Sequence, residues 1–313
     1  MEIIWYHPSQ DAGVWLEGMQ RRLPQARVRH WQPGDEAAAD YAIVRKPPRE
    51  LLAGRPGLRG VFAMGAGVDD ILAQLARYPD MLSPSVPLVR LEDTGMGRQM
   101  QEYAVYCVLG WYRRFDDYRQ LQQQAQWQPL ELAAYEAFTV GVMGAGVLGM
   151  SVIHALKPWG FPLRVWSRSP KQIAGVTSFA GREALDAFLH GTQVVINLLP
   201  STPETTDLFD ARTLSQLPQG ACLLNMARGT QVVEDDLLAA LESGQLRAAA
   251  LDVFQQEPLP PHHPLWRHPR VTVTPHIAAL TRVDEAIEAI ARAIEACEAG
   301  RQPSGCVDRL RGY

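Results

Sequence analysis

The strongest constraint on the fold is an alternation of short apolar runs with helical segments from about residue 139 onward. Near-continuous apolar runs of this kind are typical of parallel strands that are buried on both faces. The runs are TVGVM (139–143), LRVW (163–166), QVVINL (193–198), ACLLN (221–225), AAALDVF (248–254) and VTVT (271–274). Helical patterns lie between them at 147–158, 182–190, 211–217 and 234–243. This alternation predicts a doubly wound α/β domain.

A second, weaker set of apolar runs precedes this domain and predicts a smaller α/β unit. The runs are EIIWYH, ARVRH, YAIV, GVFA and PLVR. A long helical pattern, MGRQMQEYAVYCVLGWYRRF, then leads into the middle of the chain, and TRVDEAIEAIARAIEACEAG follows that domain. In this second helix Thr281 and Asp284 would form the N-terminal cap and Gly300 the stop.

If the second helix returns the chain to the first unit, the smaller domain is discontinuous. We therefore predict a flavodoxin-like substrate domain from residues 1–106 and 278–313, with a Rossmann dinucleotide-binding domain, 107–277, inserted in it. A cleft between the two domains would be the expected place for a ligand.

Composition narrows the class of protein. The chain of 313 residues is 47% hydrophobic and 20% charged, which is typical of a globular protein. Its net charge of -4 argues against nucleic-acid and anionic-membrane partners. The four cysteines lie far apart without a CxxC pair, which argues against a metal site or a disulfide framework. Without a signal sequence or a membrane-spanning run of ~18 apolar residues, we expect a cytoplasmic protein.

A GxGxxG motif follows the first strand of the middle domain and opens a helix. The first glycine, Gly144, would allow a tight turn, Gly146 would let the backbone approach a pyrophosphate, and Gly149 would let helix and strand pack closely. Amides of Val147 and Leu148 would face the phosphates at the positive end of the helix dipole. The motif predicts a dinucleotide site; the alternative is a tight turn that binds no ligand.

The next strand ends in VWSRSPK, where an acidic residue normally holds the ribose 2′-hydroxyl of NAD. Here Ser167 removes the carboxylate that would repel a 2′-phosphate, and Arg168 offers a forked cationic donor, with Ser169 and Lys171 nearby. The stretch therefore predicts a preference for NADP over NAD. The alternative is a loop of solvated surface cations.

Three later segments carry candidate catalytic residues: NMARGT (225–230), LDVFQQEPLP (251–260) and TPHIA (274–278). Arg228 follows a buried strand directly, where an isolated guanidinium would be costly unless it met an anion. Glu257 and His276 lie near strand ends, which border the ligand crevice in open α/β sheets. Each has a simpler reading, as a surface carboxylate beside Pro258 and a histidine bonded to backbone.

The glycine fingerprint, NMARG, DVFQQEP and TPH occur in an order that resembles the D-isomer-specific 2-hydroxyacid dehydrogenase family along nearly the whole chain. LEDTGMGRQMQEYAV and VDRLRGY are most similar to bacterial glyoxylate/hydroxypyruvate reductases of type A. The resemblance implies a homodimeric NADPH-dependent reductase of a small 2-oxo acid, with 127–138 as an aromatic-bearing dimer arm.

The family chemistry assigns roles to these residues. His276 would donate a proton to the carbonyl oxygen, Glu257 would orient its ring, and Arg228 would bind the substrate carboxylate. Further substrate contacts would come from a glycine turn, Gly65, Ala66 and Gly67. The predicted cofactor contacts are Gly144, Ala145, Gly146, Val147, Leu148, Gly149, Ser167, Arg168, Ser169, Lys171, Leu199, Pro200, Thr205, Met226, Ala227 and Asp252.

Three questions stay open at the level of sequence. Arg45 and Lys46 of VRKPP would either contact a charged or hydroxylated substrate or be exposed. The same mechanism would also serve a bulkier 2-oxo acid. The alternative of another class is a non-enzymatic NAD(P)H-responsive binding protein, since the fold also serves as a corepressor in some relatives.

Overall fold

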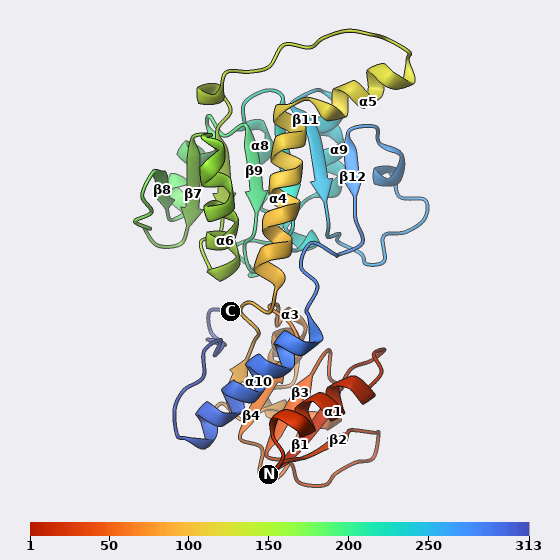
Figure 1. Cartoon of the computed structure of the whole chain (residues 1–313), viewed down its shortest axis with the longest axis vertical. Coiled ribbons are helices and arrows are strands. Elements are labelled where there is room, and N and C mark those ends of the chain that lie inside the picture. Colours follow the sequence, from red (N-terminus) through yellow and green to blue (C-terminus); the bar gives the residue numbers. More distant parts are fainter. Residues whose placement is uncertain (313) are drawn as a thin grey trace. The chain divides into compact units, whose positions relative to one another are not determined.

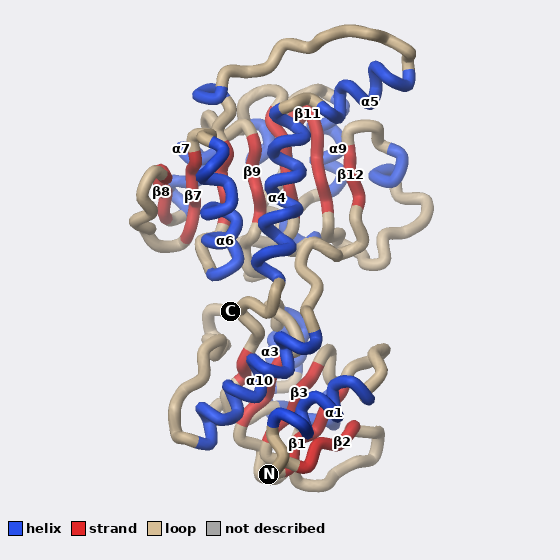
Figure 2. The backbone as a smooth tube through the Cα atoms, viewed as in Figure 1, coloured by secondary structure: helices blue, strands red, loops and turns tan. Residues whose placement is uncertain are grey.

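A computed structural model describes residues 1–312, in which strands and helices alternate and the strands form two parallel sheets (Figures 1 and 2). The chain divides into two compact units. Unit 1 is made of residues 1–95 and the segment from Thr281 onward, and unit 2 is made of 96–280. The predicted fold class, two doubly wound α/β domains with one inserted in the other, is confirmed.

Unit 1 has a five-stranded sheet in the order β2-β1-β3-β4-β5, which is the flavodoxin-like order. All five apolar runs of the first hundred residues form its strands: β1 Glu2–Tyr6, β2 Arg27–His30, β3 Tyr41–Val44, β4 Gly60–Ala63 and β5 Leu88–Val89. Its helices are α1 Gly13–Arg22, α2 Arg49–Leu52, α3 Asp69–Arg77 and α10 Val283–Glu298, with a 3-10 turn η1 Pro79–Met81.

The helix α10 joins unit 1 by packing against α1. At the contact a Cβ built on Gly18 would lie 2.4 Å from Cδ1 of Ile287, so a side chain there would force the end of the Ile287 side chain to move. The predicted cap was wrong: Arg282 is the N-cap residue of α10, while Thr281 donates its hydroxyl to the carbonyl of Met64 at 3.4 Å. The Thr281 hydroxyl is thus engaged by the backbone after β4 and does not cap the helix.

Unit 2 has a seven-stranded sheet in the order β12-β11-β10-β9-β6-β7-β8. Its strands are β6 Val140–Met143, β7 Leu163–Ser167, β8 Val176–Ala180, β9 Val194–Asn197, β10 Ala221–Asn225, β11 Leu246–Leu251 and β12 Val271–Val273. Six of them match the predicted runs, and β8 was not predicted. Counted from β6, the first six strands have the Rossmann order. The strands are all parallel, and the order in which they are added to the sheet reverses between β6 and β9.

Helices cover both faces of this sheet and bury two apolar layers. Figure 1 shows α4 and α6 side by side on one face. The opposite layer includes side chains of the three shorter helices α7 to α9. The helices are α4 Met96–Tyr112, α5 Phe115–Gln123, α6 Val147–Leu156, α7 Leu185–Leu189, α8 Ala211–Ser215 and α9 Glu234–Glu242, with 3-10 turns η2 Tyr135–Ala137, η3 Lys157–Trp159, η4 Arg182–Ala184, η5 Gly229–Gln231 and η6 Pro264–Arg267.

The unit boundaries fall at different residues from those predicted. The predicted division at residue 106 lies inside α4, whereas the contacts divide the chain at 95. The reason is that α4 packs along α6 and β10, so the whole helix belongs to unit 2. In residues 1–312, none of the helices combines the length and the apolar character needed to cross a bilayer.

Candidate active site

The three glycines of the fingerprint meet three different geometric demands. Gly144 has φ +100°, a conformation that side chains disfavour, and a Cβ on it would lie 2.7 Å from the carbonyl oxygen of Leu198. A Cβ on Gly149 would lie 2.0 Å from the carbonyl oxygen of Gly144. Gly146 is exposed, and among residues 1–312 a Cβ there would meet no heavy atom within 4 Å.

Packing within the described part of the chain therefore does not require a glycine at position 146. Gly146 lies at the N-terminus of α6, beside the sheet's reversal between β6 and β9, where open α/β sheets bind ligands. Val147 is exposed there, and Ala145 and Leu148 are half-buried. The geometry fits a pyrophosphate held against backbone amides.

The end of β7 and the turn after it carry the residues predicted to contact the 2′-phosphate of NADP. Ser167 is buried and donates its hydroxyl to the carbonyl of Ser169 at 2.8 Å, so it shapes the turn. Arg168 and Ser169 are exposed. The amide of Lys171 is held by the hydroxyl of Ser178, from β8, at 3.0 Å. The structure thus presents Arg168 on a turn that is fixed on both sides.

The predicted cofactor contacts that follow β9 lie in a loop that is closed by its own hydrogen bonds. Leu199 is buried, and Thr205 donates its hydroxyl to the carbonyl of Pro200 at 2.7 Å while accepting from the amide of Thr202. The hydroxyl of Thr205 is thus engaged inside its own loop. Its position supports a role in shaping the loop, and its contact with a cofactor stays a prediction.

A buried cluster of amide side chains, not predicted from the sequence, joins this loop to the one that follows β10. Asn197 donates to Oδ1 of Asn225 at 3.0 Å and to Oε1 of Gln231 at 2.7 Å, and all three residues are fully buried. Gln231 in turn donates to the carbonyls of Leu199 and Pro200. Buried amides need partners, and these supply them to two loops at once.

The same cluster fixes the backbone around Arg228. Oε1 of Gln231 accepts from the Arg228 amide at 3.1 Å, and Asn225 donates to the Arg228 carbonyl at 3.0 Å. The Arg228 guanidinium donates to the carbonyl of Ala227 at 2.7 Å. Met226 and Ala227 are buried. The position of Arg228 is therefore set by residues on β9, β10 and η5.

Glu257 and His276 form the pair that was predicted. Nδ1 of His276 lies 2.8 Å from Oε2 of Glu257, and Oε1 of Glu257 accepts from the amide of Phe254 at 3.1 Å. The His276 side chain is 44% exposed. With Nδ1 held by the carboxylate, Nε2 is the ring nitrogen available to exchange a proton with a ligand.

The backbone of His276 is held by Asp252. His276 has φ +56°, a conformation that is costly for a side-chain-bearing residue. Asp252 is 1% exposed, and its carboxylate accepts from the amides of Ile277 and Ala278, each at 2.8 Å, and from the hydroxyl of Thr274 at 2.6 Å. These contacts make Asp252 a positioning residue; its predicted contact with a nicotinamide stays a prediction.

Tyr103 of α4 extends this arrangement and was not among the predicted residues. Its hydroxyl lies 2.7 Å from Oγ1 of Thr274, so it contacts the group that donates to Asp252. Burial raises the pKa of Tyr103, which keeps the hydroxyl neutral. No spacing rule in the sequence connects α4 to TPH, so only the fold brings them together.

The strand ends thus gather Arg228, Asp252 and His276 at one edge of unit 2. They follow β10, β11 and β12, which are neighbours in the sheet, and Glu257 joins them through His276. The arrangement offers a cation for a carboxylate and a carboxylate-bonded imidazole for proton transfer.

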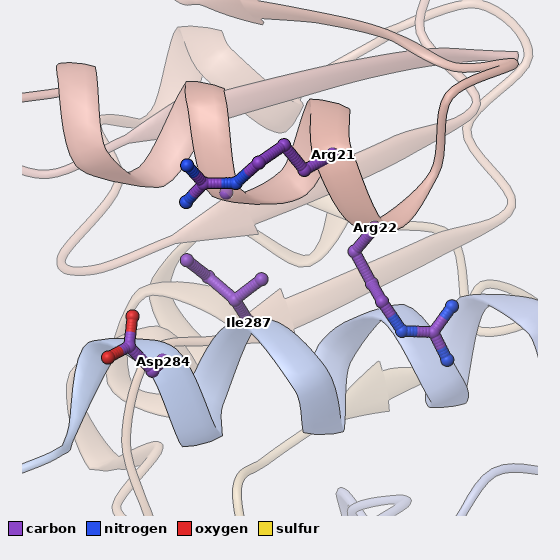
Figure 3. Close-up of a pocket in the computed structure, with 5 residues that line it drawn as sticks. Arg21, Arg22, Asp284 and Ile287 are labelled. Atoms are coloured by element: carbon purple, nitrogen blue, oxygen red, sulfur yellow. The ribbon is translucent and has the colours of Figure 1, made fainter.

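Unit 1 contains the predicted glycine turn. Gly65 is buried, Ala66 and Gly67 are half-buried, and the turn leads from β4 into α3. A separate shallow pocket lies between α1 and α10, where Arg21, Arg22, Asp284 and Ile287 surround it (Figure 3). That pocket contains none of the residues predicted to bind substrate, and Arg22 is engaged there by Glu288 at 2.8 Å.

Comparison with known proteins gives a consistent family. Residues 105–278 match the model of the D-isomer specific 2-hydroxyacid dehydrogenase, NAD binding domain. A solved D-isomer specific 2-hydroxyacid dehydrogenase from Xanthobacter autotrophicus Py2, in complex with NADPH and MES, is 38% identical, with a TM-score of 0.93, covering 100% of this chain and 99% of that one.

Two further solved structures are similar over the same extent. An NADPH-dependent glyoxylate/hydroxypyruvate reductase from Sinorhizobium meliloti, in complex with NADP and sulfate, is 33% identical, with a TM-score of 0.87. A probable 2-hydroxyacid dehydrogenase from Rhizobium etli CFN 42, in complex with NADP, HEPES and L(+)-tartaric acid, is 30% identical, with a TM-score of 0.87. Each match covers 100% of this chain and 99% of the other.

Proposed function

The chain belongs to the D-isomer-specific 2-hydroxyacid dehydrogenase family, and on that basis we propose that it uses NADPH to reduce glyoxylate to glycolate and hydroxypyruvate to D-glycerate. The observation that carries the proposal is the 2.8 Å contact between Nδ1 of His276 and Oε2 of Glu257 at the strand ends of a dinucleotide-binding fold. The similar S. meliloti protein is an NADPH-dependent reductase of these acids.

Residues of unit 2 would hold the cofactor. The open backbone at Gly146 and the N-terminus of α6 suit the pyrophosphate, and the exposed Arg168 suits a 2′-phosphate because its guanidinium can make two parallel hydrogen bonds. The loops at Leu199 and Ala227 border the same strand ends. When bound, NADPH supplies the hydride for the carbonyl carbon.

The side chains at the strand ends would do the rest of the chemistry. Arg228 binds the substrate carboxylate and stabilises the negative charge that develops on the carbonyl oxygen. Nε2 of His276 donates a proton to that oxygen as the C–H bond forms, which completes the hydroxyl group. Glu257 holds Nδ1 and so orients the ring for the transfer. The turn at Gly65 to Gly67 is proposed to add backbone amides to the carboxylate site.

The experiment is NADPH oxidation, followed by absorbance, with glyoxylate and then hydroxypyruvate. We expect turnover that falls by about 10²-fold or more in His276→Ala, the effect of removing a positioned acid. The exposed histidine His262 offers a matched control, and His262→Ala should keep wild-type rates. If no small 2-oxo acid oxidises NADPH, the proposed activity is wrong and the non-enzymatic NAD(P)H-binding alternative gains support.

We further propose a homodimer located in the cytoplasm. The segment between α5 and β6 extends from unit 2 (Figure 1), and Trp127 on it is 100% exposed. An exposed tryptophan of this kind favours a protein contact, and a two-fold axis would bury both copies. The four cysteines are unpaired thiols, which fits a reducing compartment.

A further inference from the structure

A cluster of basic side chains, His7, Arg45 and Lys46, lies at the carboxyl edge of the sheet in unit 1. β1, β3 and β4 are adjacent and parallel, and Tyr6, Val44 and Ala63 are their last residues, in register. The residues that follow directly are His7, Arg45 and Met64, so the Gly65 turn and Arg45 leave the sheet side by side. Two backbone bonds continue the ladder, from Arg45 to Tyr6 at 3.0 Å and from Met64 to Val44 at 3.0 Å.

The guanidinium of Arg45 lies against the Gly65 turn. A Cβ built on Gly65 would be 3.2 Å from Nη1 of Arg45, so the missing side chain leaves the room that the guanidinium uses. Arg45 is half-buried. Among residues 1–312 its side chain has no hydrogen bond and no carboxylate within ion-pair distance. By contrast, Arg22, Arg55 and Arg59 of the same unit all have acidic partners.

Two neighbouring groups support this guanidinium: the exposed Lys46 adds a positive charge, and His7 adds a neutral hydrogen-bond donor. Burial first, and then the charges of Arg45 and Lys46, lower the pKa of His7, so this ring is neutral at pH 7. Its Nδ1 accepts from the amides of Ser9 and Gln10 at 3.1 and 2.9 Å, which leaves the proton on Nε2 as a donor. The loop of Arg45 and Lys46 is also fixed, because Gln74 of α3 donates to the carbonyl of Pro47 at 3.0 Å.

A half-buried guanidinium loses hydration without gaining a partner, and this cost is recovered when an anion binds. We propose that Arg45, supported by Lys46 and His7, binds a second anionic group of the substrate, while the Gly65 turn binds the carboxylate next to the carbonyl. The inference rests on the proposed reductase function. It assigns as preferred substrates those 2-oxo acids that carry a carboxylate or phosphate at the far end.

The experiment compares substrates that differ in that far end. Oxaloacetate carries a second carboxylate, 4-methyl-2-oxopentanoate replaces it by an isopropyl group of the same shape, and 3-phosphohydroxypyruvate carries a phosphate. We expect kcat/KM for oxaloacetate or for 3-phosphohydroxypyruvate to exceed that for the isopropyl compound by about tenfold or more, as for a hydrogen bond to a charged group. Whichever of these two acids is preferred identifies the anionic group.

Arg45→Met tests the residue itself, because it keeps length and removes charge. We expect this variant to lose the preference for the acid with a second anionic group, through a raised KM for that acid. Its kcat/KM for glyoxylate should change by less than about fivefold. Arg21→Met is the matched control, since Arg21 is an exposed arginine of unit 1 at the pocket in Figure 3, and the preference should survive it. Two results would overturn the inference. One is an equal kcat/KM of the wild type for oxaloacetate, 3-phosphohydroxypyruvate and 4-methyl-2-oxopentanoate. The other is a loss of kcat/KM in Arg45→Met that is the same for all substrates.

A binding measurement separates this inference from the reductase proposal. D-Malate and D-lactate are titrated calorimetrically into wild-type and Arg45→Met protein saturated with NADP+. Tighter binding of D-malate that depends on Arg45 supports the anion site even if no 2-oxo acid is reduced, in which case only the proposed activity fails. Equal binding of the two acids, or binding of neither, contradicts the site.

Discussion

At the scale of single residues, the histidine proposed as the proton donor, His276, lies in a costly backbone conformation that a buried carboxylate maintains. A residue other than glycine at φ +56° costs about 1–3 kcal/mol, and Asp252 offsets this with two amide contacts on the segment that follows His276. The ring is thereby placed for Glu257 to reach Nδ1. The position of His276 therefore depends on Asp252 as well as on Glu257.

The role of Glu257 can be tested with Glu257→Gln. Because the Phe254 amide needs an acceptor, a glutamine would keep its oxygen there and turn its amide nitrogen toward Nδ1, so Nδ1 would have to accept a hydrogen bond. We expect kcat for glyoxylate reduction to fall about 10²-fold, with NADPH affinity, measured by fluorescence titration, unchanged. Glu242→Gln, at an exposed position that ends α9, is the control. A normal kcat in Glu257→Gln would remove Glu257 from the mechanism.

The turn after β7 predicts the choice between cofactors. Ser167→Asp with Arg168→Ala introduces a carboxylate and removes the exposed guanidinium. We expect the ratio of kcat/KM for NADPH over NADH to fall at least about tenfold, the value of one charge-assisted bond. Arg182→Ala removes another exposed arginine of unit 2 and should leave the ratio unchanged. An unaltered ratio in the double variant means that the phosphate is recognised elsewhere.

At this scale, the sequence predicted contacts between residues that follow closely on neighbouring strands. Glu257 and His276 are in contact, because each follows closely on a neighbouring strand. Sequence reasoning did not find Tyr103, Asn197 or Gln231, because their partners come from other elements. A signal was present for Asn197: it lies between apolar residues in the run QVVINL, and a buried amide needs a partner on another element.

At the scale of elements, the turn from β6 into α6 separates two kinds of glycine. Gly149→Ala would place a Cβ 2.0 Å from a backbone oxygen, so we expect a lower free energy of unfolding in urea. Gly146→Ala should keep wild-type stability, because its Cβ meets open space, and should weaken NADPH binding at that space. Weaker stability in Gly146→Ala with normal affinity would assign that glycine to folding.

The pattern of elements was predictable where periodicity was strong. Apolar runs gave every strand of the described chain except β8, whose residues are half-buried or exposed at the edge of the sheet. The helix α5, Phe115–Gln123, was not predicted from the sequence. α5 is anchored through Asp116 and Asp117, which contact Arg247 of β11. A tertiary ion pair of this kind leaves no periodic trace in the sequence.

At the scale of the whole molecule, the segment before β6 predicts self-association. Phe138 at its end is buried in unit 2 against Tyr112 and Phe161, so the exposed part of the arm is nearer Trp127. We expect the wild type to sediment as a dimer at micromolar concentration and Trp127→Asp to sediment as a monomer or a weaker dimer. Trp266→Asp, at another exposed tryptophan of unit 2, is the control. A monomeric wild type would contradict the proposed homodimer.

The interrupted path of the chain has a consequence for its synthesis. Every strand of unit 2 has been synthesised once residue 280 is made, whereas unit 1 still lacks α10 and the segment in which Cys306 pairs with Val89. Until then the surface of α1 around Gly18 has no covering helix. Domains fold as they emerge, so the nascent chain should complete its middle before its beginning, and the half-made first unit is the stage most exposed to aggregation and to chaperones.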